Sequence, residues 1–525
     1  MLYVATDQSP PKLTELPADR VATVSMAENW LDDTDPAHAY PSPNYRMQFE
    51  YATGAQLLNY PDASGQRGSE LQPEVAASMP AVADGGRTYA FRVKRGFRFS
   101  PPSNQEVTAE TFRYSIERAL SPGLGPEAPA YSVVSDILGA RAFHAGKAEH
   151  ISGITVDGDR LEIRLVAPAG DFLARLSSPY FAAVPVGTPI VNGGVQTPIP
   201  SAGPYYLKVS WHNDLRVLER NPNYRGSRPH RLERIVYDIN NSTRRTVDQI
   251  ESGEADYAAD ALGESTFRPG GPLDARFGPE RLAYAPQLGF HFLRFNTARG
   301  PFRDARLRRA VNYAINRRAL AAVNAETPTD AYLPPAFRRP HRRPVYPLSP
   351  DLQRARALAH GFRGAVVLYT CARPDCTATS RILRANLAAI GISVRVRQFD
   401  DPYSETLKPG AEYDMEITGW YYDWPDPSQV LNLFLDGKGF RPDWAPIPQP
   451  IPASYQRALE RAALLRGDAR RSEYPRLAAK LERNVAPFAA YATPVLPEFF
   501  STRIGCRVEQ PIVGAVDLGA LCVKS

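Results

Sequence analysis

A strand–helix–strand pattern in the second half of the chain restricts the fold more than any other feature. The apolar run Ala365–Tyr369 is typical of a buried strand, and residues 392–396 alternate between apolar and polar as in a second strand. Between them, residues 377–390 carry apolar side chains at helical spacing, and Gly391 ends that pattern. Because a helical crossover in one sheet joins parallel strands, the pattern predicts an α/β fold.

The most unusual local sequence is the loop Gly419–Pro427, which reads GWYYDWPDP. Its prolines exclude regular helix and central strand, so Asp423 and Asp426 are predicted to lie in a shaped loop at a strand end. Carboxylates among aromatic rings can recognise a cation. The alternative is a turn whose Asp side chains bond their own backbone and whose rings belong to the core.

The strand before this loop is predicted to have one buried face, because Tyr413, Met415 and Ile417 alternate with polar residues. A second loop, Cys371–Cys376, connects the first predicted strand to its helix. Right-handed crossovers place such loops at the carboxyl edge of the sheet, where α/β proteins usually bind ligands. We therefore expect the loop Gly419–Pro427 to face the same region as Cys371–Cys376.

Other parts of the chain carry local signals of their own. Hairpin turns are predicted at 84–86, 157–159 and 212–214, and Thr108 is predicted to cap a helix. Residues 2–5 resemble a strand. Long helices are also predicted over residues 45–60, 304–318, 453–465 and 470–483.

The helix expected at 304–318 contains many arginines, which we assign to its solvated faces. The net charge of the whole chain is only +6. Its densest basic run, residues 338–343, is interrupted by proline and lacks interleaved aromatic rings, so it favours a surface turn over a nucleic-acid site. The arginines of the helix are residues 303, 306, 308, 309, 317 and 318.

With 525 residues, of which 43% are hydrophobic, the chain can bury a large core and should form at least two lobes. No apolar run of about 18 residues is present, so no membrane-spanning helix is predicted. The sequence opens without a signal-peptide pattern. It is expected either to be cytosolic or to have lost a leader.

Four cysteines form two local pairs, Cys371/Cys376 and Cys506/Cys522. Two disulfides that close short loops would fit an exported protein. Free thiols and a zinc site are the alternatives. The C-x4-C and C-x15-C spacings match no common zinc motif and no His lies nearby, so no metal site is predicted.

An enzyme would need a nucleophile with a base, or a metal. The eight histidines are scattered and form no H-x-x-x-H pair, and no G-x-S-x-G motif occurs. We therefore predict neither catalytic residues nor a cofactor.

Several short segments, in their order and spacing, resemble the oligopeptide- and dipeptide-binding family of extracytoplasmic solute-binding proteins (solute-binding family 5), the receptors of ABC importers. Each segment alone is weak, but together they extend over nearly the whole chain. They are residues 71–76, 88–100, 107–111, 203–205, 221–224, 252–256, 295–304, 308–311 and 420–427.

This resemblance implies a two-lobe periplasmic-binding-protein fold with an extra subdomain and a central ligand cleft. Lobe I would comprise residues 1–285, with the subdomain at about 48–195. Lobe II would comprise residues 286–490, and residues 491–525 would return to lobe I. The lobes would close around the ligand.

The resemblance also implies a ligand and the residues that hold it. The expected ligand is a short peptide or amino-acid derivative; a sugar, an opine, a metal chelate and a lipid are alternatives. By position in the family, Asp423 would bind the amine of the ligand, and Arg373 would meet its carboxylate. The rings expected to contact the ligand are Trp420, Tyr421, Tyr422 and Trp424.

The expected partners are the permease subunits of an ABC transporter, with no nucleic acid. The protein would be a monomer in the periplasm or at the cell surface, peripheral to the membrane or held there by a lipid. A ligand sensor is the alternative role on the same fold.

Overall fold

The computed structural model describes residues 15–27, 31, 34–38, 44–126, 128–211, 214–258, 267, 270–339, 341–435 and 450–524. The strand predicted at 2–5 and most of the turn at 212–214 lie outside these residues. In the described part of the chain, no helix has the length and apolar character needed to cross a membrane.

The chain divides into two compact units. Unit 1 comprises Met1–Thr266, Gly271–Ala285 and Leu496–Ser525, and unit 2 comprises Phe267–Gly270 and Pro286–Val495. The main passage from the first unit to the second therefore falls between Ala285 and Pro286, and the return falls between Val495 and Leu496.

Unit 1 contains a seven-stranded mixed sheet and a separate four-stranded antiparallel sheet. The larger sheet has the order β12 (Leu282–Pro286), β19 (Val495–Phe500), β11 (Tyr257–Ala258), β1 (Val21–Ser25), β10 (Arg234–Asp238), β9 (Leu215–Arg220) and β8 (Tyr205–Trp211). The smaller one has the order β4 (Ala81–Ala83), β5 (Thr88–Arg92), β7 (Arg160–Arg164) and β6 (Ile154–Asp157).

The smaller sheet confirms the hairpin turns predicted at 84–86 and 157–159. Helix α3 (Ala109–Leu120) contacts this sheet, and its N-cap is Thr108 as predicted. The Thr108 hydroxyl accepts from the backbone N–H of Thr111, and the Thr111 hydroxyl accepts from that of Thr108.

The long helix predicted at 45–60 is shorter than expected. Helix α1 (Asn44–Thr53) ends before Gly54, and the following residues form β2 (Leu58–Asn59), which pairs with β3 (Gln72–Pro73). Among the described residues, the other α-helices of unit 1 are α2 (Gly65–Gly68), α4 (Ala130–Val134), α5 (Ala140–His144), α6 (Phe172–Leu176), α7 (Thr243–Ser252) and α8 (Pro272–Phe277). Its C-terminal strands are β20 (Ile504–Gly505), β21 (Glu509–Gln510), β22 (Ala515–Val516) and β23 (Cys522–Val523).

Unit 2 is built on one six-stranded mixed sheet that confirms the predicted α/β pattern. The order is β14 (Thr327–Pro328), β18 (Phe488–Thr493), β13 (Gly289–Phe295), β17 (Met415–Tyr421), β15 (Gly364–Cys371) and β16 (Ile392–Phe399). Strands β15 and β16 pair in parallel, with Gly364 opposite Ile392, and β17 also runs parallel to β15. Strand β13 lies antiparallel between β17 and β18.

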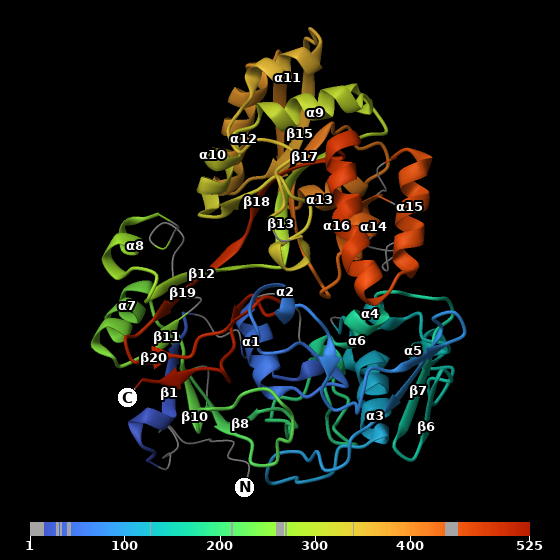
Figure 1. The fold of residues 1–525 in the computed structure, drawn as a ribbon, viewed down its shortest axis with the longest axis vertical. Helices are drawn as coiled ribbons and strands as arrows, with labels where there is room; N and C mark the ends of the chain where they lie inside the picture. The colour runs from blue at the N-terminus through green and yellow to red at the C-terminus, as the bar shows by residue number, and fades with distance from the viewer. Residues whose placement is uncertain are drawn as a thin grey trace. The chain divides into compact units, whose positions relative to one another are not determined.

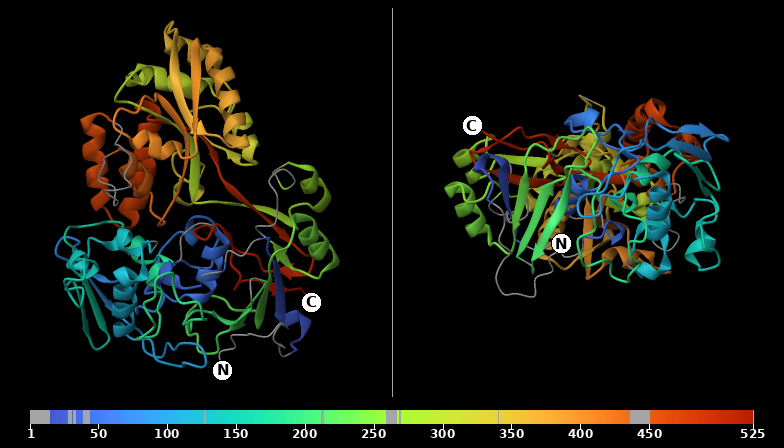
Figure 2. Two further views of the ribbon diagram at one scale, coloured as in Figure 1. Left: turned by 180° about the vertical axis from the view of Figure 1, so that it is seen from behind. Right: turned by 90° about the horizontal axis from the view of Figure 1, so that it is seen from below.

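Helices cover both faces of this sheet (Figures 1 and 2). Alternate residues of β13 enter different clusters, since Leu293 packs with the first set of helices and Phe292 with the second. The first set is α9 (Ala305–Ala314), α10 (Arg317–Ala321), α11 (Leu352–Ala359) and α12 (Pro374–Ala388). The second is α14 (Ser428–Leu435), α15 (Ala453–Leu464) and α16 (Gly467–Asn484), and α13 (Pro402–Leu407) lies between β16 and β17 in the chain.

Two predictions about polar residues in unit 2 are wrong. Strand β17 is buried on both faces, because Glu416 is fully buried in an ion pair with Arg294, a residue of the neighbouring strand. Arg308 and Arg317 are also buried rather than solvated. Their guanidinium groups donate to backbone carbonyls of the segment that leads into β18 and of β18 itself, so they satisfy buried acceptors.

The predicted helix at 304–318 is in fact two helices, α9 and α10. Asn316 separates them and caps α10 through its side chain. In the basic run at 338–343, predicted to be a surface turn, Arg342 forms ion pairs with the buried carboxylates of Asp330 and Glu482.

Candidate functional site

Several strand ends of unit 2 meet at one edge of its sheet. The carboxyl ends of β15, β16, β17 and β18 lie there, together with the start of β13 and the segment that enters β14. Binding residues often lie on loops at this edge of an α/β sheet. The loops Cys371–Cys376 and Gly419–Pro427 both begin at this edge.

Asp423 lies two residues beyond the end of β17, and a side chain from the next helix orients it. The backbone N–H of Asp423 donates to Oε1 of Gln429 at 2.8 Å, and Nε2 of Gln429 donates back to the Asp423 carboxylate at 2.6 Å. Gln429 is buried in the first turn of α14, whereas Asp423 is half-buried. These two bonds hold the half-buried carboxylate in a defined position.

Asp426 has a different environment. Its carboxylate accepts two hydrogen bonds of 2.7 Å from Arg470, and it also accepts from the backbone N–H of Ser428 at the start of α14. Both side chains of the pair are at least nine-tenths buried. Arg470 further donates to three carbonyls around the end of α15, Ala462, Ala463 and Leu465. Asp426 thus joins the loop to two helices.

The four aromatic rings of the loop divide between surface and core. Tyr421 is 45% exposed, whereas Tyr422 and Trp424 are buried. Trp420 is half-buried and packs edge-to-face on Phe434, with ring centroids 5.2 Å apart. Tyr421 is therefore the predicted ring with the most surface open to a ligand, and the other three contribute mainly to packing in unit 2.

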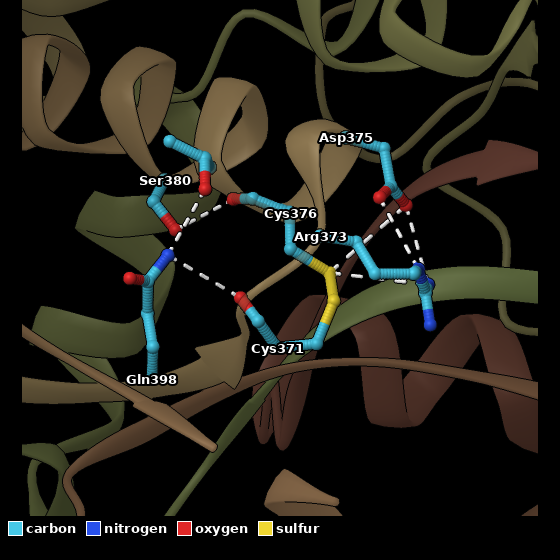
Figure 3. Close-up of a disulfide and its surroundings, with 7 residues drawn as sticks. Cys371, Arg373, Asp375, Cys376, Ser380 and Gln398 are labelled. Carbon is cyan, nitrogen blue, oxygen red and sulfur yellow. Dashed lines mark hydrogen bonds and ion pairs between the residues drawn. A yellow bond between two sulfur atoms is a disulfide. The ribbon is translucent and has the colours of Figure 1, made fainter. Parts of the chain in front are cut away.

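The loop Cys371–Cys376 is closed by a disulfide and carries Arg373 at its tip (Figure 3). Helix α12 begins at Pro374, three residues before the predicted start, because proline suits the first position of a helix. Gln398 of β16 donates to the Thr377 hydroxyl at 3.0 Å and reaches the Cys371 carbonyl at 3.4 Å. The loop is consequently tied to the sheet.

Arg373 projects from this loop with 71% of its side chain exposed, and it pairs with Asp375 at 3.2 Å. Partial burial alone would raise the pKa of the Asp375 carboxyl, but hydrogen bonds from Arg373 and from the Cys376 backbone hold that pKa below its ordinary value. Asp375 also lies with Cys371 and Cys376 in a grouping of potential metal ligands. Their disulfide removes the two thiolates that a metal would need.

The second disulfide, Cys506–Cys522, lies in unit 1 and links the start and end of the C-terminal segment. Both cystine pairs expected from the local spacing are therefore present. Within the described residues no cysteine is free.

Sequence reasoning missed two polar residues at the same edge of unit 2. His291, in β13, pairs through Nδ1 with Oε1 of Glu326 at 2.7 Å. The available signal was weak: a single His alternates with phenylalanines in the segment FHF, and its partner lies 35 residues further along the chain. Gln429 and Arg470 were missed for the same reason, because their importance depends on tertiary contacts.

Comparison with known proteins places the chain among receptors for solutes. The family model for bacterial extracellular solute-binding proteins, family 5 (middle part), matches residues 70–441, which is more than half of the chain. The dipeptide-binding protein DppE of Bacillus subtilis (strain 168) is 23% identical over 425 residues, which cover 76% of this chain and 75% of that protein.

Two further comparisons extend this result. The probable deoxycholate-binding periplasmic protein YgiS of Escherichia coli (strain K12) is 26% identical over 343 residues, which cover 62% of this chain and 60% of that protein. The solved structure of the periplasmic murein tripeptide-binding protein MppA, in its unliganded open form, superposes with a TM-score of 0.79 at 20% identity. That match covers 98% of this chain and 99% of MppA, and shows a shared fold. The chain therefore belongs to family 5 of the bacterial extracellular solute-binding proteins.

Proposed function

We propose that this solute-binding protein captures a short peptide or amino-acid derivative, and that Asp423 binds the amino group of that ligand. The observation that carries the proposal is the position of the Asp423 carboxylate, half-buried at a strand end and oriented by Gln429. An ammonium group would form a charge-assisted hydrogen bond with such a carboxylate. It would also compensate the charge when the ligand excludes water from it.

Arg373 is the proposed partner of the ligand carboxylate. It lies beyond the end of β15, the strand next to β17, and its guanidinium is largely exposed. Asp375 now occupies one side of that guanidinium, so a ligand carboxylate would share or displace this contact. Tyr421 would contribute a ring face close to the ligand.

In this proposal the protein works outside the cytoplasm as the receptor of an ABC importer and delivers its ligand to the permease subunits. It would act as a monomer, and a lipid would hold it at the membrane where an anchor is present. The family description, which names extracellular solute-binding proteins, supports the location.

A non-peptide solute is the second candidate. The similarity to a probable deoxycholate-binding protein favours it, because a bile acid carries a carboxylate but no amine. Such a ligand would depend on Arg373 and not on Asp423. The two candidates therefore differ at Asp423: its substitution should weaken binding of a peptide but not of such a carboxylate, whereas substitution of Arg373 should weaken binding of both.

The first experiment identifies the ligand and tests the anchor. Mass spectrometry of the purified protein identifies any co-purified solute, and titration calorimetry then compares L-alanyl-L-alanine with its N-acetylated form. We expect acetylation to abolish binding. Asp423→Asn should weaken binding of the free dipeptide by about 2–4 kcal/mol, because it removes the charge while it keeps the size of the side chain.

The matched control is Asp426→Asn, in the same loop. This substitution breaks a buried ion pair, so it should lower the free energy of unfolding by about 3 kcal/mol and leave the affinity of the folded protein unchanged. Unchanged affinity in Asp423→Asn would exclude the amine anchor. The ligand would then be better described as a solute that binds through Arg373 and has no amine held by Asp423.

A further inference from the structure

His291, Glu326, Tyr421 and Tyr491 form a polar cluster at the candidate edge of unit 2, called here the His291 cluster. They come from four separate segments: β13, the residue before β14, the end of β17 and β18. The ring centroid of His291 lies 6.1 Å from that of Tyr421 and 6.2 Å from that of Tyr491. None of the four is needed to hold Asp423 or Arg373.

At the centre of the cluster, His291 pairs with only one of the two carboxylate oxygens of Glu326. Nδ1 of His291 lies 2.7 Å from Oε1 of Glu326, whose side chain is only 6% exposed. The second oxygen of this carboxylate is buried and has no hydrogen-bond partner among the described residues. A buried carboxylate with an unsatisfied oxygen favours positive charge in its neighbourhood.

Gly419 makes the position of the His291 ring possible. The two residues are directly opposite each other in the pairing of β13 with β17. A Cβ atom at position 419 would lie 2.1 Å from Cδ2 and 2.5 Å from Nε2 of the imidazole. The ring therefore lies over the glycine, and its side chain remains 19% exposed.

Two carboxylates lie near the ring of Tyr491. Burial raises the pKa of Tyr491, and the nearby carboxylates of Glu326 and Asp375 raise it further. The charge of Asp375, at the start of α12, is balanced by Arg373. Among the described residues, Glu326 forms an ion pair only with the imidazole of His291, so no lysine or arginine of that part of the chain balances its carboxylate.

We propose that the His291 cluster binds a second cationic group of the ligand, an ammonium or a guanidinium. The inference rests on the proposed function, because it assumes a ligand already held at this edge. Glu326 acts as a positioning residue: it accepts the Nδ1 proton and leaves Nε2 of His291 as an acceptor toward the ligand. The half-exposed ring of Tyr421 adds a cation–π surface.

The first test measures selectivity with matched dipeptides. L-alanyl-L-lysine should bind at least about tenfold more tightly than L-alanyl-L-norleucine, which has a side chain of similar length without the charge. In Glu326→Gln this preference should disappear, while the affinity for the norleucine peptide stays as in the wild type. Equal affinities in the wild type, or a preference that survives in Glu326→Gln, would overturn the proposal.

The second test does not depend on dipeptide binding. In the Asp423→Asn background, n-butylammonium chloride is titrated while the imidazole nitrogens of ¹⁵N-labelled histidines are followed by NMR, with His291 assigned from His291→Gln. The His291 signals should show a proton on Nδ1 and should shift with the cation, and Glu326→Gln should remove the shift. If Glu326 had only a structural role, n-butylammonium would not shift the His291 signals even with Glu326 in place.

The two tests separate this inference from the proposed function. If dipeptides fail to bind but n-butylammonium still shifts the His291 signals, the peptide proposal fails and the cation site stands. If dipeptides bind without a preference for lysine and the His291 signals do not move, the cation site is excluded and the peptide proposal stands.

Discussion

Asp423 and Asp426 lie three residues apart, yet their neighbours give them different roles. The side chain of Gln429 accepts from the backbone N–H of Asp423 and donates to one oxygen of its carboxylate, and Asp423 is half-buried. Arg470 takes up both oxygens of Asp426 and buries it. In the sequence both are Asp residues beside aromatic rings and prolines. The tertiary contacts with Gln429 and Arg470 therefore distinguish Asp423, the candidate anchor, from Asp426, a member of a structural ion pair.

Gly419→Ala tests how much the edge depends on the position of His291. The new methyl group would lie 2.1 Å from the imidazole, so the ring must move or the strands must separate. We expect the free energy of unfolding to fall by about 1–3 kcal/mol, with altered His291 signals in NMR spectra. Chemical denaturation measures the stability.

Gly505→Ala is the matched control for that substitution. It also adds a methyl group in a strand, but the nearest atom is the flexible side chain of Lys524 at 3.2 Å. It should change stability by less than about 1 kcal/mol. Equal effects of the two substitutions would show that contact with His291 does not matter.

Arginine illustrates at the residue scale why charge alone is a poor guide to exposure. Arg294, Arg308 and Arg317 are all buried in unit 2. Arg294 pairs with Glu416, and the other two donate to backbone carbonyls. The planar guanidinium has five donors and can satisfy several acceptors at once, so it enters a core that offers them.

At the scale of elements, the disulfide of the loop Cys371–Cys376 joins the end of β15 to the first turn of α12. It closes a loop with a sequence separation of 5, whereas Cys506–Cys522 spans 16. In the chain-entropy model, a longer closed loop restricts the unfolded chain more. The two cystines should therefore contribute differently to stability.

Removal of each cystine by a double Cys→Ala substitution tests this difference. Loss of Cys506–Cys522 should lower the free energy of unfolding by about 3 kcal/mol, and loss of Cys371–Cys376 by about 2 kcal/mol. Only the loss of Cys371–Cys376 should weaken ligand binding, since this disulfide alone closes the loop that carries Arg373. Non-reducing peptide mapping should find both links. Four alkylatable thiols in protein from an oxidising compartment would contradict the assignment.

At the scale of the whole molecule, the C-terminal segment of unit 1 carries two buried acids. Burial raises the pKa of Glu498 to about 7, although Tyr257 and the Val516 backbone donate to its carboxylate. Burial, together with the neighbouring Asp62, also raises the pKa of Asp517 to about 7. Both groups therefore bind protons more tightly in the folded protein than in the unfolded chain.

This difference predicts how stability depends on pH. The folded-state pKa values lie above the unfolded ones, so the stabilising effect is complete below about pH 4 and is lost as the pH rises through about 7. For Glu498 the loss should amount to roughly 3 kcal/mol. Glu498→Gln should remove this contribution, and Asp517→Asn should act additively. Urea unfolding between pH 5 and 8 measures the slope; an unchanged slope in both variants would contradict the prediction.

The sequence by itself determined much of the local structure. Apolar periodicity predicted the strand–helix–strand unit, because a run of about ten residues already contains the information on which face is buried. The Thr108 cap, the hairpin turns at 84–86 and 157–159 and the positions of the cysteine pairs followed from local chemistry in the same way. Ordered short segments also indicated the family, which the family model then confirmed.

Only the tertiary structure decided which polar residues are buried and what they meet. Glu416 alternates with apolar residues as a solvated side chain would, but it is fully buried and Arg294 neutralises it. His291 and Glu326 meet because β14, β18 and β13 are neighbours in the sheet. Such contacts join residues far apart in the chain. Their energies depend on distance and burial, neither of which a local pattern of residue types contains.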